Sequence, residues 1–395
     1  MRSSLLACLS KLSLLPALIA LGLAGQALAD TATHTLTRSI AIAAGSTVEV
    51  QNLVGRMTVS PGGGTLEVTA TVVAGGKDRA AAEALTQTVK LSVETAGNRV
   101  SVHVDYPVDQ YDSYRYDGRG DRQLSSGCIL GIFCVQSTSD LSYQGHRVRI
   151  HQNSGDGAPL HVDVAIKLPA GASADLTNYV GFIKVLNVKN NLGLHSDSGD
   201  MQVNQVTGNL NIDTGSGDIG IANQDGATVV HTGSGDVAVR DVKGNLNIHT
   251  GSGDVSGGNL QGDTLETVTG SGDVVLDGLS GALNLRAGSG DIHLTGIKAH
   301  GGTAVHTGSG DITLNGDLSG MSDFNLRAGS GDITLITSQP PAVHLDITTG
   351  SGDIEVHWPG VNNVTASDDS FSGDIGTAKA TGQIHTGSGD VILKR

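Results

Sequence analysis

The chain has 395 residues and a formal net charge of −15, and it contains 57 Gly but only 4 Phe and 1 Trp. Such an acidic surface repels nucleic acid and anionic membranes, so neither is expected as a partner. The shortage of aromatic residues argues against a conventional globular core of this length, whereas the regular recurrence of Val, Ile and Leu argues against disorder.

The first 29 residues have the features of a secretory signal peptide. A basic start with Arg2 and Lys11 leads into an apolar run over residues 12–23, which closes on the small residues of Ala27-Leu28-Ala29. The run is interrupted and falls short of the roughly 18 apolar residues that a membrane span requires. We therefore expect cleavage after Ala29 and an exported mature chain without a membrane span. Because no surface-sorting motif is evident, the periplasm is favoured over secretion or surface attachment.

Residues 30–175 are expected to form a β-rich N-terminal portion that begins the same stack of strands as the rest of the chain. Residues 52–59 already resemble one rung of a solenoid. A short helix is predicted near residues 78–86. Alternating apolar residues predict strands over residues 48–50, 57–59, 66–73, 89–93 and 100–104.

An insertion at about residues 105–144 carries tyrosines and two cysteines. In an exported chain, Cys128 and Cys134 predict a disulfide that pins a loop, since further Cys or His at metal-ligand spacing are missing nearby. Tyrosines anchor interfaces with little entropic loss, so four of them are candidates for an interaction surface. Packing of the insertion against the solenoid is the alternative. The candidates are Tyr106, Tyr111, Tyr114 and Tyr116.

Residues 176–395 repeat the tripeptide Ser-Gly-Asp eleven times, at intervals of 18 to 21 residues before a final interval of 16. Periodicity on this scale is typical of stacked supersecondary units. The repeated aspartates are Asp200, Asp218, Asp236, Asp254, Asp273, Asp291, Asp311, Asp332, Asp353, Asp374 and Asp390.

A core-type residue follows each of these aspartates, and ten of the eleven are β-branched, which favours strand over helix. The apolar residue usually returns two positions later, so one face of the strand points inward. A second strand, such as residues 210–214, leads to the next turn after a Gly-containing bend, as at Gly208 and Gly244. The pattern predicts an all-β parallel solenoid of about 12 coils and roughly 55 Å, at about 4.8 Å per coil.

The electrostatic repulsion within a row of stacked aspartates has to be offset by other interactions. Carboxylates about 5 Å apart repel each other by roughly 0.8 kcal/mol in water and more in a lower dielectric. One interpretation is that each Asp caps local backbone N–H groups of its own turn. The other is that calcium bridges successive rungs, which makes the eleven aspartates candidate metal ligands.

A second column of polar residues lies five residues before several of these aspartates, and alternation places it on the outer face. It is interpreted as a solvated row that partly offsets the Asp charge, or as an imidazole ladder that could bind zinc. Its members are His231, His249, Arg286, His306, Arg327 and His385.

Several of these features together resemble the DUF4097 family of β-strand-repeat proteins, often labelled "putative adhesins". They are the early rung at Gly55, the strand and helix around residues 80–93, the segment 166–171 and the iterated Thr-Gly-Ser-Gly-Asp turns. The resemblance covers nearly all of the mature chain. It implies a β-solenoid outside the cytoplasm without known catalytic residues, and the insertion departs from its pattern.

We therefore expect an exported, non-enzymatic scaffold of the cell envelope that serves adhesion or protein interaction. Catalytic sites need non-repeated acids and bases gathered in a groove, whereas these carboxylates belong to repeated turns. The alternative is a structural or ion-binding module ordered by calcium, and no other cofactor is expected. The partner is an unidentified protein or envelope component. Self-association through the solenoid ends is a further expectation, because residues 391–393 end the chain without an obvious cap.

Overall fold

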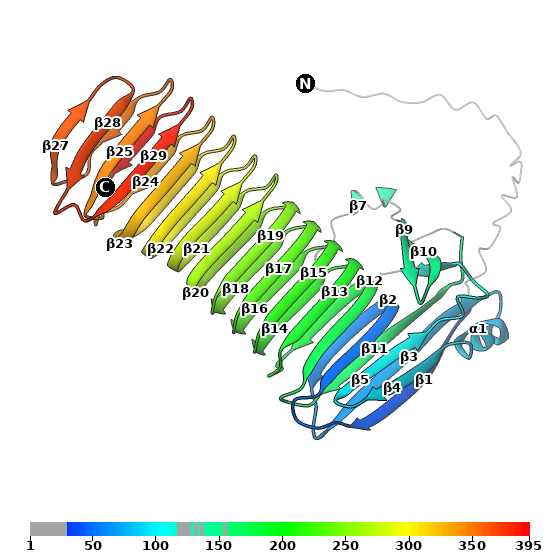
Figure 1. Cartoon of the computed structure of the whole chain (residues 1–395). Helices are drawn as coiled ribbons and strands as arrows, with labels where there is room; N and C mark the ends of the chain where they lie inside the picture. Colours follow the sequence, from blue (N-terminus) through cyan, green and yellow to red (C-terminus); the bar gives the residue numbers. More distant parts are fainter. Residues whose placement is uncertain (1–29, 117–127, 130–132, 135–137, 153–155) are drawn as a thin grey trace, which may run out of the picture.

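A computed structural model of the chain describes residues 30–116, 128–129, 133–134, 138–152 and 156–395, with the side chains of residues 128–129 and 133–134 excepted. The predicted signal peptide, residues 1–29, lies outside the described residues. The described chain is a rod of stacked strands with a broader N-terminal end (Figure 1). The predicted fold, an all-β parallel solenoid with a short helix in its N-terminal part, is confirmed.

The N-terminal end of the rod is a capped first rung. Strand β2 (Thr47–Pro61) forms a complete rung, because it pairs in parallel with β12 (Ser173–Leu186) from Thr47↔Ser173 to Val59↔Val185. On the other side of β2, β5 (Arg99–Asp105) covers its first half and β11 (Leu160–Leu168) its second half. Further strands and the helix complete this end: β1 (Asp30–Ala41), β3 (Thr65–Gly76), α1 (Arg79–Thr86) and β4 (Lys90–Ala96).

Helix α1 begins where the sequence provides a cap. The Asp78 side chain accepts a hydrogen bond from the Ala81 N–H at 2.8 Å, which satisfies one of the free amides of the first turn. The helix packs against β1 and β3 and ends at Thr86. One sheet continues from this end into the repeats, so no break in strand pairing marks the expected division at residues 175/176. That division stays a prediction.

In the repeats, each strand pairs in parallel with the strand one coil later, as in Ile219↔Val237. The residue after each turn Asp points into the core, and Met201, Ile219 and Val237 are all buried. From β20 to β23 a single strand runs through both halves of each coil. The strands are β13 (Leu192–Ser198), β14 (Met201–Thr207), β15 (Leu210–Ser216), β16 (Ile219–Asp225), β17 (Thr228–Ser234), β18 (Val237–Lys243), β19 (Leu246–Ser252), β20 (Val255–Thr269), β21 (Val274–Ala287), β22 (Ile292–Thr307), β23 (Ile312–Ala328) and β24 (Ile333–Ile336).

Glycine is required at the turn because adjacent coils approach closely there. Gly235 has a φ of +133°, and a Cβ at this position would lie 2.2 Å from the carbonyl oxygen of Gly217 in the preceding coil. No side chain fits such a gap, and this φ also disfavours any residue with a Cβ. The turn glycines therefore set how tightly the coils stack.

The last strands do not stack in sequence order. Strand β30 (Val391–Lys394) lies between β24 and β26 (Ile354–Val356), since Val391 is the register partner of both Ile333 and Ile354. Likewise β29 (Ala380–Thr386) lies between β23 and β25 (Val343–Thr349). Before it forms β29 and β30, the chain makes a hairpin of β27 (Val361–Ala366) and β28 (Ser370–Ile375). Strand β28 also pairs antiparallel with β25 (Figure 1).

The placement of β30 between β24 and β26 corrects the expectation that residues 391–393 form a free end for self-association. Both edges of β30 are paired, and Val391 and Leu393 are fully buried. The physical reason is that inserting the strand buries its apolar face and pairs its backbone groups.

The Tyr- and Cys-containing insertion at about residues 105–144 folds partly into the core. Its strands β6 (Ser113–Tyr116) and β9 (Thr138–Tyr143) form a three-stranded sheet with β10 (His146–Gln152), which follows the insertion, while β7 (Cys128–Ile129) and β8 (Phe133–Cys134) form a separate pair. Among the described residues, no helix is long and apolar enough to cross a membrane.

Candidate functional site

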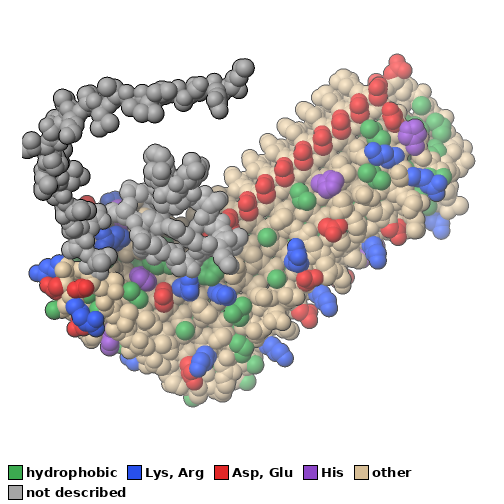
Figure 2. Space-filling view, turned by 180° about the vertical axis from the view of Figure 1, so that it is seen from behind, with side chains coloured by type: hydrophobic (Ala, Val, Ile, Leu, Met, Phe, Trp, Pro, Cys, Tyr) green, Lys and Arg blue, Asp and Glu red, His purple; other side chains and the backbone are tan. Residues whose placement is uncertain are grey.

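The repeated aspartates form a hydrogen-bonded ladder along one edge of the solenoid, visible as a straight red row in Figure 2. The Asp236 N–H donates to Oδ1 of Asp218 at 3.0 Å, and the Asp254 N–H donates to Oδ1 of Asp236 at 2.9 Å. Each carboxylate therefore caps an amide of the neighbouring coil. The interpretation as a cap on its own turn is wrong in this respect, because the next coil's amide lies directly above the carboxylate.

Ten of the predicted aspartates are joined in this ladder, which follows the spatial order of the coils. Asp332 accepts from the Asp390 N–H and Asp390 accepts from the Asp353 N–H, each at 2.8 Å. The remaining links join Asp200, Asp218, Asp236, Asp254, Asp273, Asp291, Asp311 and Asp332 in sequence order.

Asp374 is the exception, because it lies in the antiparallel strand β28 and not at a solenoid turn. Its side chain accepts a hydrogen bond from Asn363 Nδ2 at 2.7 Å and lies 2.7 Å from His344 Nδ1. These two bonds lower the pKa of Asp374, and the same carboxylate raises the pKa of His344. Ser-Gly-Asp in the sequence therefore does not by itself guarantee a place in the row.

The metal interpretation of the aspartates stays a prediction. Within the part of the chain that the structure describes, no group of three or more His, Cys, Asp or Glu side chains is placed to hold a metal ion. In each ladder link one carboxylate oxygen is already engaged by an amide. Calcium binding would have to use the second oxygen of successive residues.

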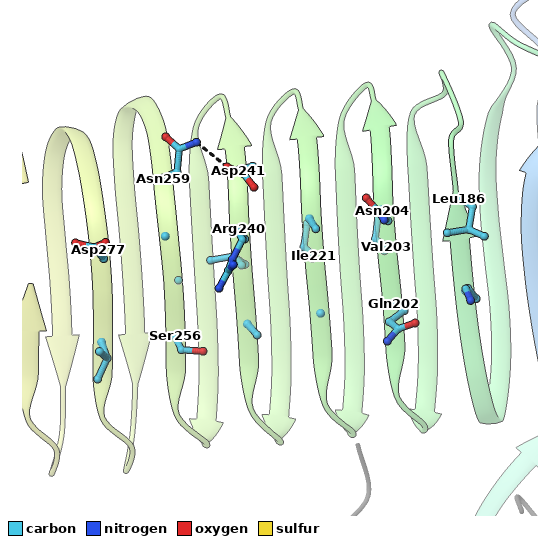
Figure 3. Close-up of a pocket in the computed structure, with 18 residues that line it drawn as sticks. Leu186, Gln202, Val203, Asn204, Ile221, Arg240, Asp241, Ser256, Asn259 and Asp277 are labelled. Carbon is cyan, nitrogen blue, oxygen red and sulfur yellow. Dashed lines mark hydrogen bonds between the residues drawn. The ribbon is translucent and has the colours of Figure 1, made fainter. Parts of the chain in front are cut away.

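A trough of about 970 Å³ lies on the sheet formed by the first half of each coil (Figure 3). Outward positions on successive rungs are unusually small there, with Gly220, Ala238 and Ser256 in one row. Arg240 projects over the middle of the trough, and Val275, which is 49% exposed, lies at one end. The small side chains leave the sheet surface accessible to a partner.

A column of left-handed residues lines one rim of the trough. Asn223, Asp241 and Asn259 have φ values of 55°, 54° and 56°, a conformation that Asn and Asp tolerate better than other non-glycine residues. Asn259 Nδ2 donates to Asp241 Oδ1 at 2.6 Å, which ties neighbouring rungs together (Figure 3). Sequence analysis missed this rim. Its signal was Asn, Asp or Gly five residues after several of the turn aspartates.

Part of the repeat region matches the model of a known protein family. Residues 229–394 match the model described as Toastrack DUF4097. This stretch is similar to the Toastrack DUF4097 family. The resemblance seen in the sequence is thereby confirmed for this stretch, which includes the inserted C-terminal strands. No curated protein matches the chain.

Three solved structures resemble the chain at low identity. A "putative cell adhesion protein" from Clostridium sporogenes is 10% identical, over 92% of this chain and 99% of that one, with a TM-score of 0.18. A "putative adhesin" from Bacteroides fragilis is 11% identical, over 91% and 97%, with a TM-score of 0.24. A "putative lipid binding protein" from Parabacteroides distasonis is 11% identical, over 90% and 96%, with a TM-score of 0.31. Because these TM-scores are low, our conclusions rest on the strand pairing described above.

The histidine column runs along the sheet opposite the trough, within residues 229–394. His231 and His249 are register partners, and their rings lie 5.2 Å apart. The next position is Val268, which separates them from Arg286, His306 and Arg327. The column is therefore not a continuous imidazole ladder, because an apolar side chain interrupts it.

Three of the four candidate surface tyrosines are buried, which corrects their assignment to an interaction surface. Tyr106, Tyr114 and Tyr116 are at most 7% exposed, and only Tyr111, at 38%, reaches solvent. The Tyr106 and Tyr114 rings meet edge to face at 5.4 Å, and Tyr106 donates to the Val54 carbonyl at 2.8 Å. The insertion packs against the first rung, because aromatic rings with a satisfied hydroxyl bury favourably.

The two cysteines are backbone partners. Cys128 and Cys134 lie directly opposite each other in the antiparallel pair of β7 and β8. Directly opposed residues of an antiparallel pair have Cα atoms about 4.5–5.5 Å apart, which is within the range of disulfides. Their side chains are outside the described part of the structure, so the disulfide stays a prediction.

Proposed function

We propose that the chain is an exported, non-enzymatic β-solenoid scaffold that binds a protein or another envelope component through the trough. The observation that carries this proposal is the row of small outward residues, Gly220, Ala238 and Ser256, across adjacent rungs. Backbone hydrogen bonds hold that floor rigid, so binding would order few groups of the scaffold. Arg240 and Asp277 supply fixed charges for specificity.

The chemistry of the trough supports binding and not catalysis. Its acidic side chains are committed to neighbours: Asp241 Oδ1 accepts from Asn259, and Asp277 Oδ1 accepts from Thr295 Oγ1 at 2.7 Å. The described residues that line it include no His or Cys. General acid–base catalysis would need a proton donor and acceptor that converge on one substrate atom.

Adhesion of envelope fragments from the source organism to immobilised residues 30–395 tests the proposal. Ala238→Arg places a long charged side chain in the trough and should abolish saturable adhesion. Thr313→Arg is the matched control, because Thr313 lies on the same sheet outside the trough. Equal adhesion of wild type and Ala238→Arg would refute the role of the trough.

Export is proposed from the N-terminal sequence. Fractionation of expressing cells should place the protein in the periplasm, and N-terminal sequencing of that material should begin at Asp30. Cytoplasmic protein that still carries Met1 would contradict export.

Calcium-dependent ordering is the second candidate function, and the straight ladder of carboxylates favours it (Figure 2). A ligand that binds only the folded state must raise the unfolding midpoint. Thermal unfolding in chelator and then in millimolar calcium separates the two functions. A midpoint that stays the same would leave the aspartates as amide caps alone.

A further inference from the structure

A second hollow, of about 560 Å³, lies on the opposite sheet and crosses β21, β22, β23 and β29. Its floor is formed by Gly302 and Ala304 on β22, which are the smallest residues among longer neighbours. The register partners of Ala304 are Asn284 on one side and Asn325 on the other. Asn284 and Asn325 are therefore two rung spacings apart, or roughly 10 Å.

Fixed amides form its walls. Asn284 Nδ2 donates to Glu266 Oε1 at 3.0 Å, which leaves Asn284 Oδ1 without a hydrogen-bond partner. Asn325 Nδ2 donates to Gln383 Oε1 at 3.2 Å. Thr303, only 3% exposed, lies beneath the hollow on the inward face of β22.

Two arginines lie beside the hollow. Arg286 follows Asn284 by two residues on β21, and Arg327 follows Asn325 by two residues on β23, so all four lie on the same face of the sheet. Arg286 and Arg327 flank His306 in register, one rung on each side. Arg327 Nε donates to Asn325 Oδ1 at 2.9 Å, so this guanidinium is held beside the hollow. Burial and the two arginines lower the pKa of His306, whose Nε2 is buried without a partner. The imidazole is therefore neutral at pH 7, and the charge there comes from the arginines.

The opposite end of the hollow carries an acceptor. Asp323 Oδ1 accepts from the Thr381 N–H at 2.8 Å, which fixes the carboxylate at the rim. A simple anion would be repelled by Asp323. A ligand that satisfies both ends must bring a negative group to the arginines and hydroxyl donors to the acceptors.

We propose that this hollow binds a carboxylate-bearing saccharide, with its carboxylate at Arg286 and Arg327 and its hydroxyls at Asp323. Guanidinium groups bind carboxylates through two parallel hydrogen bonds, which explains a pair of arginines on a strongly acidic protein. One sugar ring lies flat over Ala304, where no side chain obstructs it. The site is independent of the trough, which lies on the other sheet.

Calorimetric titration of residues 30–395 tests this assignment with three probes: a galacturonic acid trimer, the neutral galactose trimer and inorganic phosphate. We expect the acidic trimer to bind at least tenfold more tightly than either of the others. If the neutral trimer bound as tightly as the acidic trimer, the arginines would have no role in recognition. Equal binding of phosphate would show a plain anion site. Either result, or no binding of the acidic trimer, overturns the proposal.

Variants locate the site. Arg286→Gln with Arg327→Gln should weaken the acidic trimer at least tenfold and change the neutral trimer little. Ala304→Leu fills the hollow and should abolish binding, whereas Ala238→Leu, a matched change in the trough, should leave it intact. If Ala304→Leu unfolds, the exposed arginine variants still decide, and unchanged affinity in them contradicts the assignment.

Discussion

The backbone N–H of Asp390 donates a hydrogen bond to Oδ1 of Asp332, 58 residues earlier in the chain, at 2.8 Å. The links from Asp200 to Asp332 join residues one coil apart in sequence, for example 18 residues between Asp218 and Asp236. The long link shows that the last coil of the sequence is an inner coil of the stack. The stability of the C-terminal end therefore depends on residues at the very end of the chain.

Deletion of residues 380–395 should disorder the whole C-terminal end. The deletion removes β29 and β30, so β25 and β26 lose the strands that join them to β23 and β24. Hydrogen exchange should show lost protection in β25, β26 and β28. Strands β14 to β18 should keep theirs, because coils of a repeat protein are stabilised by their nearest neighbours. Retained protection in β25 would contradict the insertion.

Asp254→Ala should destabilise the protein by about 1 kcal/mol, whereas Asp254→Asn should be nearly neutral. The alanine leaves the Asp273 N–H without its acceptor, now 2.9 Å away, while asparagine keeps an Oδ1 in that place. Asparagine also removes one charge from a row of like charges. Urea unfolding measures both changes. A loss for asparagine as large as that for alanine would show that charge, and not the hydrogen bond, is what the row requires.

Gly235→Ala should destabilise by about 3 kcal/mol or more, since it combines strained backbone with a steric clash. The added Cβ would lie 2.2 Å from the Gly217 oxygen, and the φ of +133° is unfavourable for alanine. Gly220→Ala is the control, because a Cβ there meets nothing closer than 3.9 Å. Its midpoint in thermal unfolding should equal or exceed that of the wild type. Similar losses for both variants would refute close coil contact as the cause.

Tyr106→Phe should cost about 1–2 kcal/mol, and Tyr114→Phe should be neutral or stabilising. The Tyr106 hydroxyl donates to the Val54 carbonyl at 2.8 Å, while the buried Tyr114 hydroxyl has no hydrogen-bond partner. Removal of an unsatisfied hydroxyl relieves a desolvation penalty. Chemical denaturation of the two variants gives the comparison, and the opposite order would be inconsistent with this packing.

The same tyrosines predict a loss of stability in alkali. Burial raises the pKa of Tyr106, Tyr114 and Tyr143 above the ordinary value of 10.0. The unfolded chain therefore ionises first, so the stability is complete below about pH 10 and falls as the pH rises further, by up to about 1.4 kcal/mol per pH unit for each group. Urea unfolding between pH 9 and pH 11 should show the decline. The decline should be shallower in Tyr106→Phe, and an identical slope would argue against ionisation of Tyr106.

The sequence by itself determined the repeating part of this protein. Gly, Asp and a β-branched residue recur at one coil length, which predicts a turn, a strand and an inward face in every coil. Helix α1 was likewise predictable, because Asp78 caps it locally. The rim of Asn223, Asp241 and Asn259 could also have been found from its regular spacing.

Only the tertiary structure decided which coils are neighbours and which polar groups meet. Asp374 carries the same tripeptide as Asp390, yet one lies in a hairpin and the other in the ladder. The tyrosines are buried because the insertion folds back onto the first rung, and the hollow at Ala304 exists because longer residues stack on both sides of it. Such contacts join residues far apart in sequence, so no local pattern encodes them. They depend on where the chain finds an unpaired strand edge and an apolar face to cover.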